Sequence, residues 1–262
     1  MNRQSLLSLA VGAFAMAGFL SMAHAQGDAW GDIKGRIVWG SDQIPPQANL
    51  DLKANPDKAA CLVKGPVKDE TWVVNPKNKG VKNVFVWLEG TTKGAKLPIH
   101  PDLKKVVHLK LEVDQPACAF IPHAVALREG QVLVAKNTSG IGHNFKWTGN
   151  PAINPGGNSL LPPGASKEID DLKADRIPIQ IECNIHPWMK GWARVFDHPY
   201  YAVTDDDGNF TIKNAPTGDY RIKYWQGSAG WLGGVKGKDG DPIKIKGGAN
   251  NLEEKPFPPP AD

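Results

Sequence analysis

The chain has 262 residues, of which 41% are hydrophobic and 22% charged, and its formal net charge is +4. This excess of positive charge is too small to imply nucleic acid or an anionic membrane as a partner. Lysine and arginine also form no stripe interleaved with aromatic residues, so we expect no nucleic-acid partner.

The first residues have the composition of an export signal. Arg3 supplies a positive charge, Leu6–Leu20 is almost wholly apolar, and Ala23–Ala25 has small residues at both ends. We therefore expect residues 1–25 to be a signal peptide. The alternative is a membrane anchor, but the apolar run is shorter than the roughly 20 residues that a spanning helix needs. With no cysteine near the cleavage site and no later apolar segment of spanning length, we expect a periplasmic or secreted protein without a membrane span.

Short runs with the character of β-strands follow one another along the rest of the chain. The 28 glycines and 22 prolines fit many turns and argue against long helices. We predict strands over Asp32–Trp39, Asn83–Glu89, Val106–Val113, Ala124–Arg128, Gln131–Lys136, Ile177–Glu182, Trp192–Phe196, Asn209–Lys213, Tyr220–Trp225 and Pro242–Lys246. This pattern predicts an all-β protein built from sandwiches.

A β-sandwich of about 90 residues fits within residues 106–199, between a segment at 26–105 and another at 200–262. The C-terminal segment carries an Asp-Gly turn at Asp207 and a Pro-x-Gly turn at Pro216, each between two predicted strands. Such turns indicate hairpins. These repeated hairpins resemble those of carboxypeptidase-regulatory-like and transthyretin-like sandwiches.

Neither flanking segment offers enough strands for a closed sandwich of its own. We therefore predict that both flanks pair into a second sandwich, with residues 106–199 inserted between them. This arrangement requires Asp32–Trp39 to share a sheet with Tyr220–Trp225. The alternative is one sandwich core that is decorated by extra strands.

The three cysteines leave one over after a disulfide has formed. A free thiol is vulnerable in an oxidising compartment, so the third cysteine needs a role. We assign Cys61 and Cys118 to the disulfide and Cys183 to a metal-bound thiolate. The alternative is a bridge that includes Cys183 and leaves another cysteine idle.

The segment Cys183–Met189, with the sequence CNIHPWM, places a thiolate, an imidazole and a thioether three residues apart. A mononuclear blue copper site uses one Cys, two His and a weak axial Met. Cys183 follows a predicted strand and can point to a metal, while His186 and Met189 lie in the tight loop before the next strand. The second histidine must come from a distant turn, for which His143 is a good candidate.

Other metal sites need other donors. A binuclear copper centre requires a second cysteine in the loop, and a structural zinc site uses more Cys or His and no Met. A catalytic copper site keeps an open coordination position, which Met189 is expected to fill, so we expect no enzymatic activity. Pro187 lacks an N–H and cannot donate a hydrogen bond near the thiolate, where such bonds tune the reduction potential.

With these residues the chain resembles the cupredoxins, the type 1 copper proteins. The loop, with Pro187 and an aromatic residue after the histidine, looks most like the short loop of amicyanin, and plastocyanin-like loops are similar but longer. Upstream, the run from Phe120 through Val132 to His143 is similar to the cupredoxin run into the first histidine ligand. The resemblance covers roughly residues 106–199 and implies a Greek-key β-sandwich. Exported bacterial proteins that join a cupredoxin to a carboxypeptidase-regulatory-like segment are similar over more of the chain.

The resemblance also implies a ligand set. His143, Cys183 and His186 would be the equatorial ligands of one type 1 Cu(I)/Cu(II) ion, and Met189 the axial ligand. Asn144 matches a residue whose side chain ties the first-ligand loop to the cysteine loop.

The implied function is one-electron transfer, from a donor such as a dehydrogenase to an acceptor such as a c-type cytochrome or an oxidase. In cupredoxins the edge of the C-terminal histidine ligand reaches the surface inside an apolar patch where partners dock. Trp188 follows closely on that histidine and would belong to the patch, unless it is a core residue.

The remaining candidates carry weaker signals. A structural role is favoured over a ligand role for His123, and His100, His108 and His198 have no partner pattern. Asp205–Asp207 fail the EF-hand pattern, which favours a solvated turn. The alternative function is a carbohydrate- or peptide-binding sandwich with a structural or secondary copper site, and exposed aromatic residues such as Trp225 and Trp231 would serve it.

Overall fold

The computed structural model describes residues 29–258, so the signal peptide predicted over residues 1–25 lies outside the described residues. Helical structure in the described part is limited to α1 (Lys58–Cys61) and the 3-10 turns η1 (Pro101–Leu103) and η2 (Gly234–Asp239). The prediction of an all-β protein is therefore confirmed. No helix within residues 29–258 is long and apolar enough to cross a membrane.

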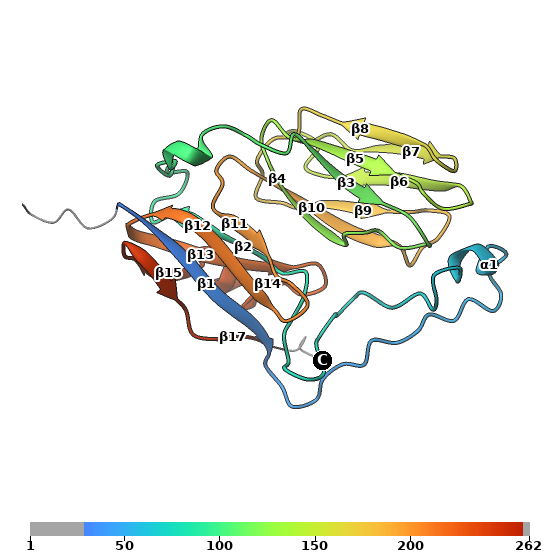
Figure 1. Ribbon diagram of the computed structural model, residues 1–262, viewed down its shortest axis with the longest axis horizontal. Coiled ribbons are helices and arrows are strands. Elements are labelled where there is room, and N and C mark those ends of the chain that lie inside the picture. Colours follow the sequence, from blue (N-terminus) through green and yellow to red (C-terminus); the bar gives the residue numbers. More distant parts are fainter. Residues whose placement is uncertain (1–28, 259–262) are drawn as a thin grey trace, which may run out of the picture.

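Residues 110–196 form two facing sheets, which we call the central sandwich (Figure 1). Its strands are β3 (Lys110–Asp114), β4 (Ala124–Arg128), β5 (Val132–Lys136), β6 (His143–Thr148), β7 (Gly157–Leu161), β8 (Ser166–Ile169), β9 (Ile179–Glu182) and β10 (Lys190–Phe196). One sheet has the order β4-β10-β9-β6-β7 and the other has the order β3-β5-β8. Leu127, Leu133 and Phe145 are fully buried in its core, where apolar burial drives folding.

The segments before and after the central sandwich pair with each other in two further sheets, which we call the flanking sheets (Figure 1). Their strands are β1 (Trp30–Trp39), β2 (Phe85–Gly90), β11 (Tyr201–Val203), β12 (Asn209–Pro216), β13 (Gly218–Gln226), β14 (Gly230–Trp231), β15 (Asp241–Ile245), β16 (Gly248–Asn251) and β17 (Lys255–Phe257). The first sheet has the order β12-β1-β16, with β17 also against β1. The second has the order β11-β2-β13-β14, with β15 also against β13.

The pairing required by the insertion arrangement is not observed. β1 pairs with β12, β16 and β17, whereas β13 lies in the other sheet beside β2. The prediction that Asp32–Trp39 shares a sheet with Tyr220–Trp225 is therefore wrong. The physical reason lies in the two predicted hairpin turns. The strands that each turn joins, β11 with β12 and β12 with β13, belong to different sheets, so both turns carry the chain across a sandwich.

An aromatic layer joins the flanking sheets to the central sandwich. Trp192 on β10 meets Trp225 on β13 edge to face, with ring centroids 4.9 Å apart. Trp87 on β2 lies beside Phe196 on β10 at 5.9 Å. Because large aromatic side chains bury much apolar area, this layer makes a substantial contact between the two parts.

Between β1 and β2 the chain makes a long excursion that carries α1 to one end of the central sandwich (Figure 1). Backbone hydrogen bonds from Leu50 to Val67 and from Asp69 to Ala48, both 2.9 Å, close its base. Its apolar side chains, including Leu52, join the core of the central sandwich. We call residues 48–69 the cover segment. A disulfide between Cys61 and Cys118 ties it down, which confirms the predicted pairing.

Candidate metal centre

The predicted copper loop lies at the end of β9, as the sequence indicated. Cys183 follows Glu182, the last residue of β9, and β10 begins at Lys190. The Cys183 N–H donates to the Met189 carbonyl at 3.2 Å, and the Met189 N–H donates to the His186 carbonyl at 2.9 Å. These bonds make the loop compact, and the side chains of Cys183 and Met189 are buried in the core of the central sandwich.

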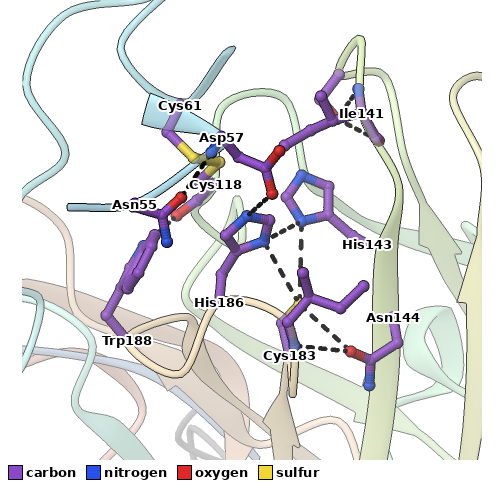
Figure 2. Close-up of polar contacts among 12 residues, drawn as sticks. Asn55, Asp57, Cys61, Cys118, Ile141, His143, Asn144, Cys183, His186 and Trp188 are labelled. Carbon is purple, nitrogen blue, oxygen red and sulfur yellow. Dashed lines mark hydrogen bonds and ion pairs between the residues drawn. A yellow bond between two sulfur atoms is a disulfide. The ribbon is translucent and has the colours of Figure 1, made fainter. Parts of the chain in front are cut away.

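Sheet pairing brings His143 to this loop. His143 is the first residue of β6, which pairs with β9. We expected His143 to lie in a turn that is far from the loop in sequence. It is far from the loop in sequence, but it is the first residue of a strand. The Nδ1 atoms of His143 and His186 are 3.0 Å apart, and Cys183 Sγ lies 3.9 Å from the first and 3.8 Å from the second (Figure 2).

These three donor atoms fit one metal ion. A neutral imidazole offers one lone pair, and a thiolate is a soft ligand that suits copper. Zinc sites show bond lengths of about 2.0 Å to nitrogen and about 2.3 Å to sulfur. With similar lengths, an ion between the two nitrogens and the sulfur would have nearly planar trigonal coordination. That is the equatorial geometry of a blue copper site.

Burial keeps the His143 ring in the neutral form that a metal ligand needs. His143 is fully buried, and its Nε2 has no hydrogen-bond partner within residues 29–258. Burial, and secondly the charge on His186, lower the pKa of His143 to about 4, so its ring is neutral at pH 7. In a neutral ring that carries its proton on Nε2, the Nδ1 lone pair is free to bind a cation.

Asn144 ties the two ligand segments together. Its Oδ1 accepts hydrogen bonds from the backbone N–H groups of Asn184 at 2.8 Å and Ile185 at 3.3 Å, and Cys183 Sγ lies 3.4 Å away (Figure 2). Its Nδ2 donates to Asn158 Oδ1 on β7 at 2.8 Å. These hydrogen bonds fix the orientation of the cysteine loop against β6.

The cover segment closes the site on the histidine side. Asp57 Oδ2 lies 3.1 Å from His186 Nε2, and His186 has no exposed surface (Figure 2). The expectation that the edge of this histidine reaches the surface is therefore wrong, because Asp57 and the turn of α1 lie over it. The disulfide sulfurs also approach His186, but a disulfide offers no thiolate to a metal.

No local pattern in the sequence singles out Asp57, which is 129 residues from His186. The one available signal is its neighbour Cys61, whose partner Cys118 lies in the central sandwich. A hydrogen bond from Nε2–H to Asp57 fixes the His186 tautomer with Nδ1 as the free lone pair. Asp57 is thus a positioning residue that the disulfide holds in place.

Trp188 is half-buried at the edge of the site. Its Nε1 donates to the Cys118 carbonyl at 3.1 Å, and its ring centroid lies 5.2 Å from that of His186. It packs against the core of the central sandwich and also keeps some exposed surface. Both roles considered for Trp188, core residue and docking residue, are compatible with this position.

The other predicted candidates lie outside the triangle of donor atoms. His123 Nδ1 is 3.4 Å from Glu70 Oε2, and His198 Nδ1 accepts from the Tyr200 N–H at 3.1 Å. Asp205 caps a turn by accepting from the N–H groups of Asp207 and Asn209 at 3.0 and 2.8 Å. Trp225 is buried against Trp192, so it offers no exposed aromatic surface for a carbohydrate.

No protein-family model and no curated protein matches this sequence. Among solved structures, the chain is similar to a purple cupredoxin from Nitrosopumilus maritimus, with 18% identity over 32% of this chain and 98% of that chain and a TM-score of 0.28. It is also similar to a reduced amicyanin variant, with 13% identity over 42% of this chain and 98% of that chain and a TM-score of 0.31.

A third similar structure is a copper-containing nitrite reductase from Thermus scotoductus SA-01, with 19% identity over 41% of this chain and 30% of that chain and a TM-score of 0.31. Each of these three similarities covers less than half of this chain.

Proposed function

We propose that this protein is an exported, mononuclear type 1 copper protein that carries one electron at a time between redox partners. The observation that supports the proposal most is the buried triangle of His143 Nδ1, His186 Nδ1 and Cys183 Sγ. Two imidazoles and one thiolate at these separations form the equatorial donor set of a blue copper site. Met189 ends the same loop and is the proposed axial ligand.

Bound copper would supply a one-electron couple between Cu(II) and Cu(I). The protein's own groups would keep the ligands in one arrangement during that change. Asn144 fixes the cysteine loop to β6, and Asp57 holds the proton on His186 Nε2. Pro187 offers no N–H to the thiolate. Burial of the triangle excludes water from the ligand atoms, which favours electron transfer over chemistry on a substrate.

The proposal includes a location in the periplasm or outside the cell, with a donor such as a dehydrogenase and an acceptor such as a c-type cytochrome or an oxidase. Weak electron-transfer complexes use small contacts. Because Asp57 covers the edge of His186, a partner would touch the cover segment or Trp188 instead of the ring itself. The flanking sheets would be a carboxypeptidase-regulatory-like sandwich that serves as a docking or structural module.

The colour of the copper-loaded protein tests this proposal. Oxidised protein with one copper should be intensely blue or green because of thiolate-to-Cu(II) charge transfer. Ascorbate should bleach the colour, ferricyanide should restore it, and Cys183→Ser should abolish it while the fold is retained. Fully loaded protein that stays colourless and cannot be cycled between two oxidation states would contradict the proposal.

A further inference from the structure

A cavity of about 680 Å³ lies between the flanking sheets and the central sandwich, away from the proposed copper site. Its walls come from β2 and β13, from β10, from the loop at residues 90–97 and from residues 174–176. None of the proposed copper ligands lines it. Its volume falls within the range of about 300–1,000 Å³ that is usual for small-molecule sites.

The wall of the cavity holds a buried cation. Arg194 on β10 is 3% exposed, and its guanidinium carbon lies 3.9 Å from the centroid of the Trp87 ring. Nη1 donates to the Arg176 carbonyl at 3.1 Å, but the buried Nε has no partner among the residues that the structure describes. Burial lowers the pKa of Arg194 to about 10, so the side chain keeps its charge at neutral pH. A buried charge is costly unless its hydrogen-bond donors are paired.

The acidic residues near Arg194 are engaged elsewhere. Glu89 accepts from Trp87 Nε1 at 3.1 Å through Oε1 and pairs with Lys223 at 2.5 Å through Oε2. Asp175 accepts from the Arg176 N–H at 2.6 Å through Oδ1, whereas its Oδ2 is buried and lacks a partner within residues 29–258. Two residues that line the cavity therefore each keep one buried polar atom without a partner within residues 29–258, a donor on Arg194 and an acceptor on Asp175.

The charge of the lining favours an anion. Seven of the lining residues are Lys or Arg, and four are Asp or Glu. Exposed basic side chains at the rim, including Lys93 and Lys238, would draw a small anion toward Arg194. Trp87 and Phe196 add an apolar wall against which a carbon skeleton can pack.

We propose that this cavity binds a small organic acid that carries a hydroxyl group, with its carboxylate on Arg194 and its hydroxyl donating to Asp175. The planar guanidinium of Arg194 matches the geometry of the ligand's carboxylate. The ligand's hydroxyl can donate its proton to a carboxylate oxygen of Asp175. Arg194 and Asp175 line the same cavity, so one small ligand can lie against both residues. This inference does not depend on copper.

Calorimetric titration of the full-length, metal-free protein tests the site. Gluconate and galacturonate should bind at one site per chain. Butyrate, which has no hydroxyl, and glucose, which has no charge, should bind at least about tenfold more weakly because one buried group then stays unpaired. Arg194→Met should abolish gluconate binding. Lys110→Met removes a positive charge outside the cavity and should leave the affinity unchanged.

A second variant distinguishes a specific site from a general charge effect, and it also serves if Arg194→Met does not fold. Asp175→Asn should weaken gluconate about tenfold and should not weaken butyrate. The proposal is overturned if native protein binds neither hydroxy acid, if inorganic phosphate binds as tightly as gluconate, or if both variants bind gluconate as native protein does. Titration of Cys183→Ser should give the native affinity, so failure of the copper assignment leaves this test intact.

Discussion

The candidate metal centre and the cavity both gather buried polar groups, yet those groups differ in kind. At the metal centre, lone pairs of His143, His186 and Cys183 converge, so a cation satisfies them. In the cavity, a buried N–H of Arg194 has no partner within residues 29–258 and basic residues outnumber acidic ones, so the proposed ligand is an anion. The balance of donors, acceptors and charges, more than the shape of the space around them, indicates the charge of the ligand.

The two places also differ in how they are closed. The metal centre lies under the cover segment, which a disulfide ties to the central sandwich. The cavity lies at a non-covalent contact between the flanking sheets and the central sandwich, and its rim is exposed. We therefore expect changes at the disulfide to act on the metal side and changes at cavity residues to leave the metal side intact.

Removal of the disulfide should have the largest effect on stability. The bridge spans 57 residues, for which chain entropy predicts a contribution of about 4 kcal/mol to the free energy of unfolding. Denaturant unfolding of the variant with Cys61→Ser and Cys118→Ser measures it. Hydrogen exchange should become faster in residues 48–69 and stay unchanged in β2 and β13. Equal acceleration in both places would contradict the separation of the two regions.

The pH dependence of the free energy of unfolding tests the residues around the cavity. Burial lowers the pKa of His198, which lines the cavity, to about 4, compared with 6.5 in the unfolded chain. As the pH falls, His198 is therefore protonated in the unfolded state before it is protonated in the folded state. Its contribution to the free energy of unfolding is complete above pH 6.5 and is lost as the pH falls toward 4. Native protein should lose up to about 3 kcal/mol more over this range than His198→Asn, whose amide oxygen can accept from Tyr200. Parallel curves for the two proteins would contradict this account.

Asp57→Asn should raise the reduction potential of the copper-loaded protein. The change removes a negative charge that favours the oxidised ion. The expected size is about 1 kcal/mol, or about 40 mV, because Asp57 is partly exposed and its effect is screened. Asp51→Asn makes the same charge change at an exposed position of the cover segment. Equal shifts in the two variants would show that the contact with His186 has no special effect.

Pro187→Gly should shift the potential less than Asp57→Asn does. The substitution introduces a neutral N–H dipole near the thiolate, whereas Asp57→Asn removes a full charge beside His186. Pro151→Gly, in an exposed loop, is the matched control. Voltammetry that finds no shift for Pro187→Gly would count against a role for the missing N–H.

Much of the central sandwich was predictable because its signals are local. Ala124–Arg128 was predicted with the observed bounds, and the loop between β9 and β10 follows from the spacing of Cys183, His186 and Met189. β6 was not predicted, although it carries His143, because its sequence HNFKWT has no clear alternation of apolar and polar residues.

The features that were missed depend on long-range contacts. β16, with the sequence GANN, has little strand propensity and forms only because its backbone pairs with β1. The hairpin prediction failed because a turn motif fixes the reversal of the chain but not the sheet in which the next strand lies. Asp57 and Arg194 contact residues that are far away in the sequence, and no local spacing in the sequence predicts such contacts.

X-ray absorption spectroscopy of protein loaded with one equivalent of copper tests the central claim most directly. The triangle predicts one sulfur and two nitrogen neighbours at bonding distance, and loss of the sulfur in Cys183→Ser while the nitrogens remain. A copper environment of nitrogen and oxygen alone in the native protein would contradict the claim that these three side chains hold one ion.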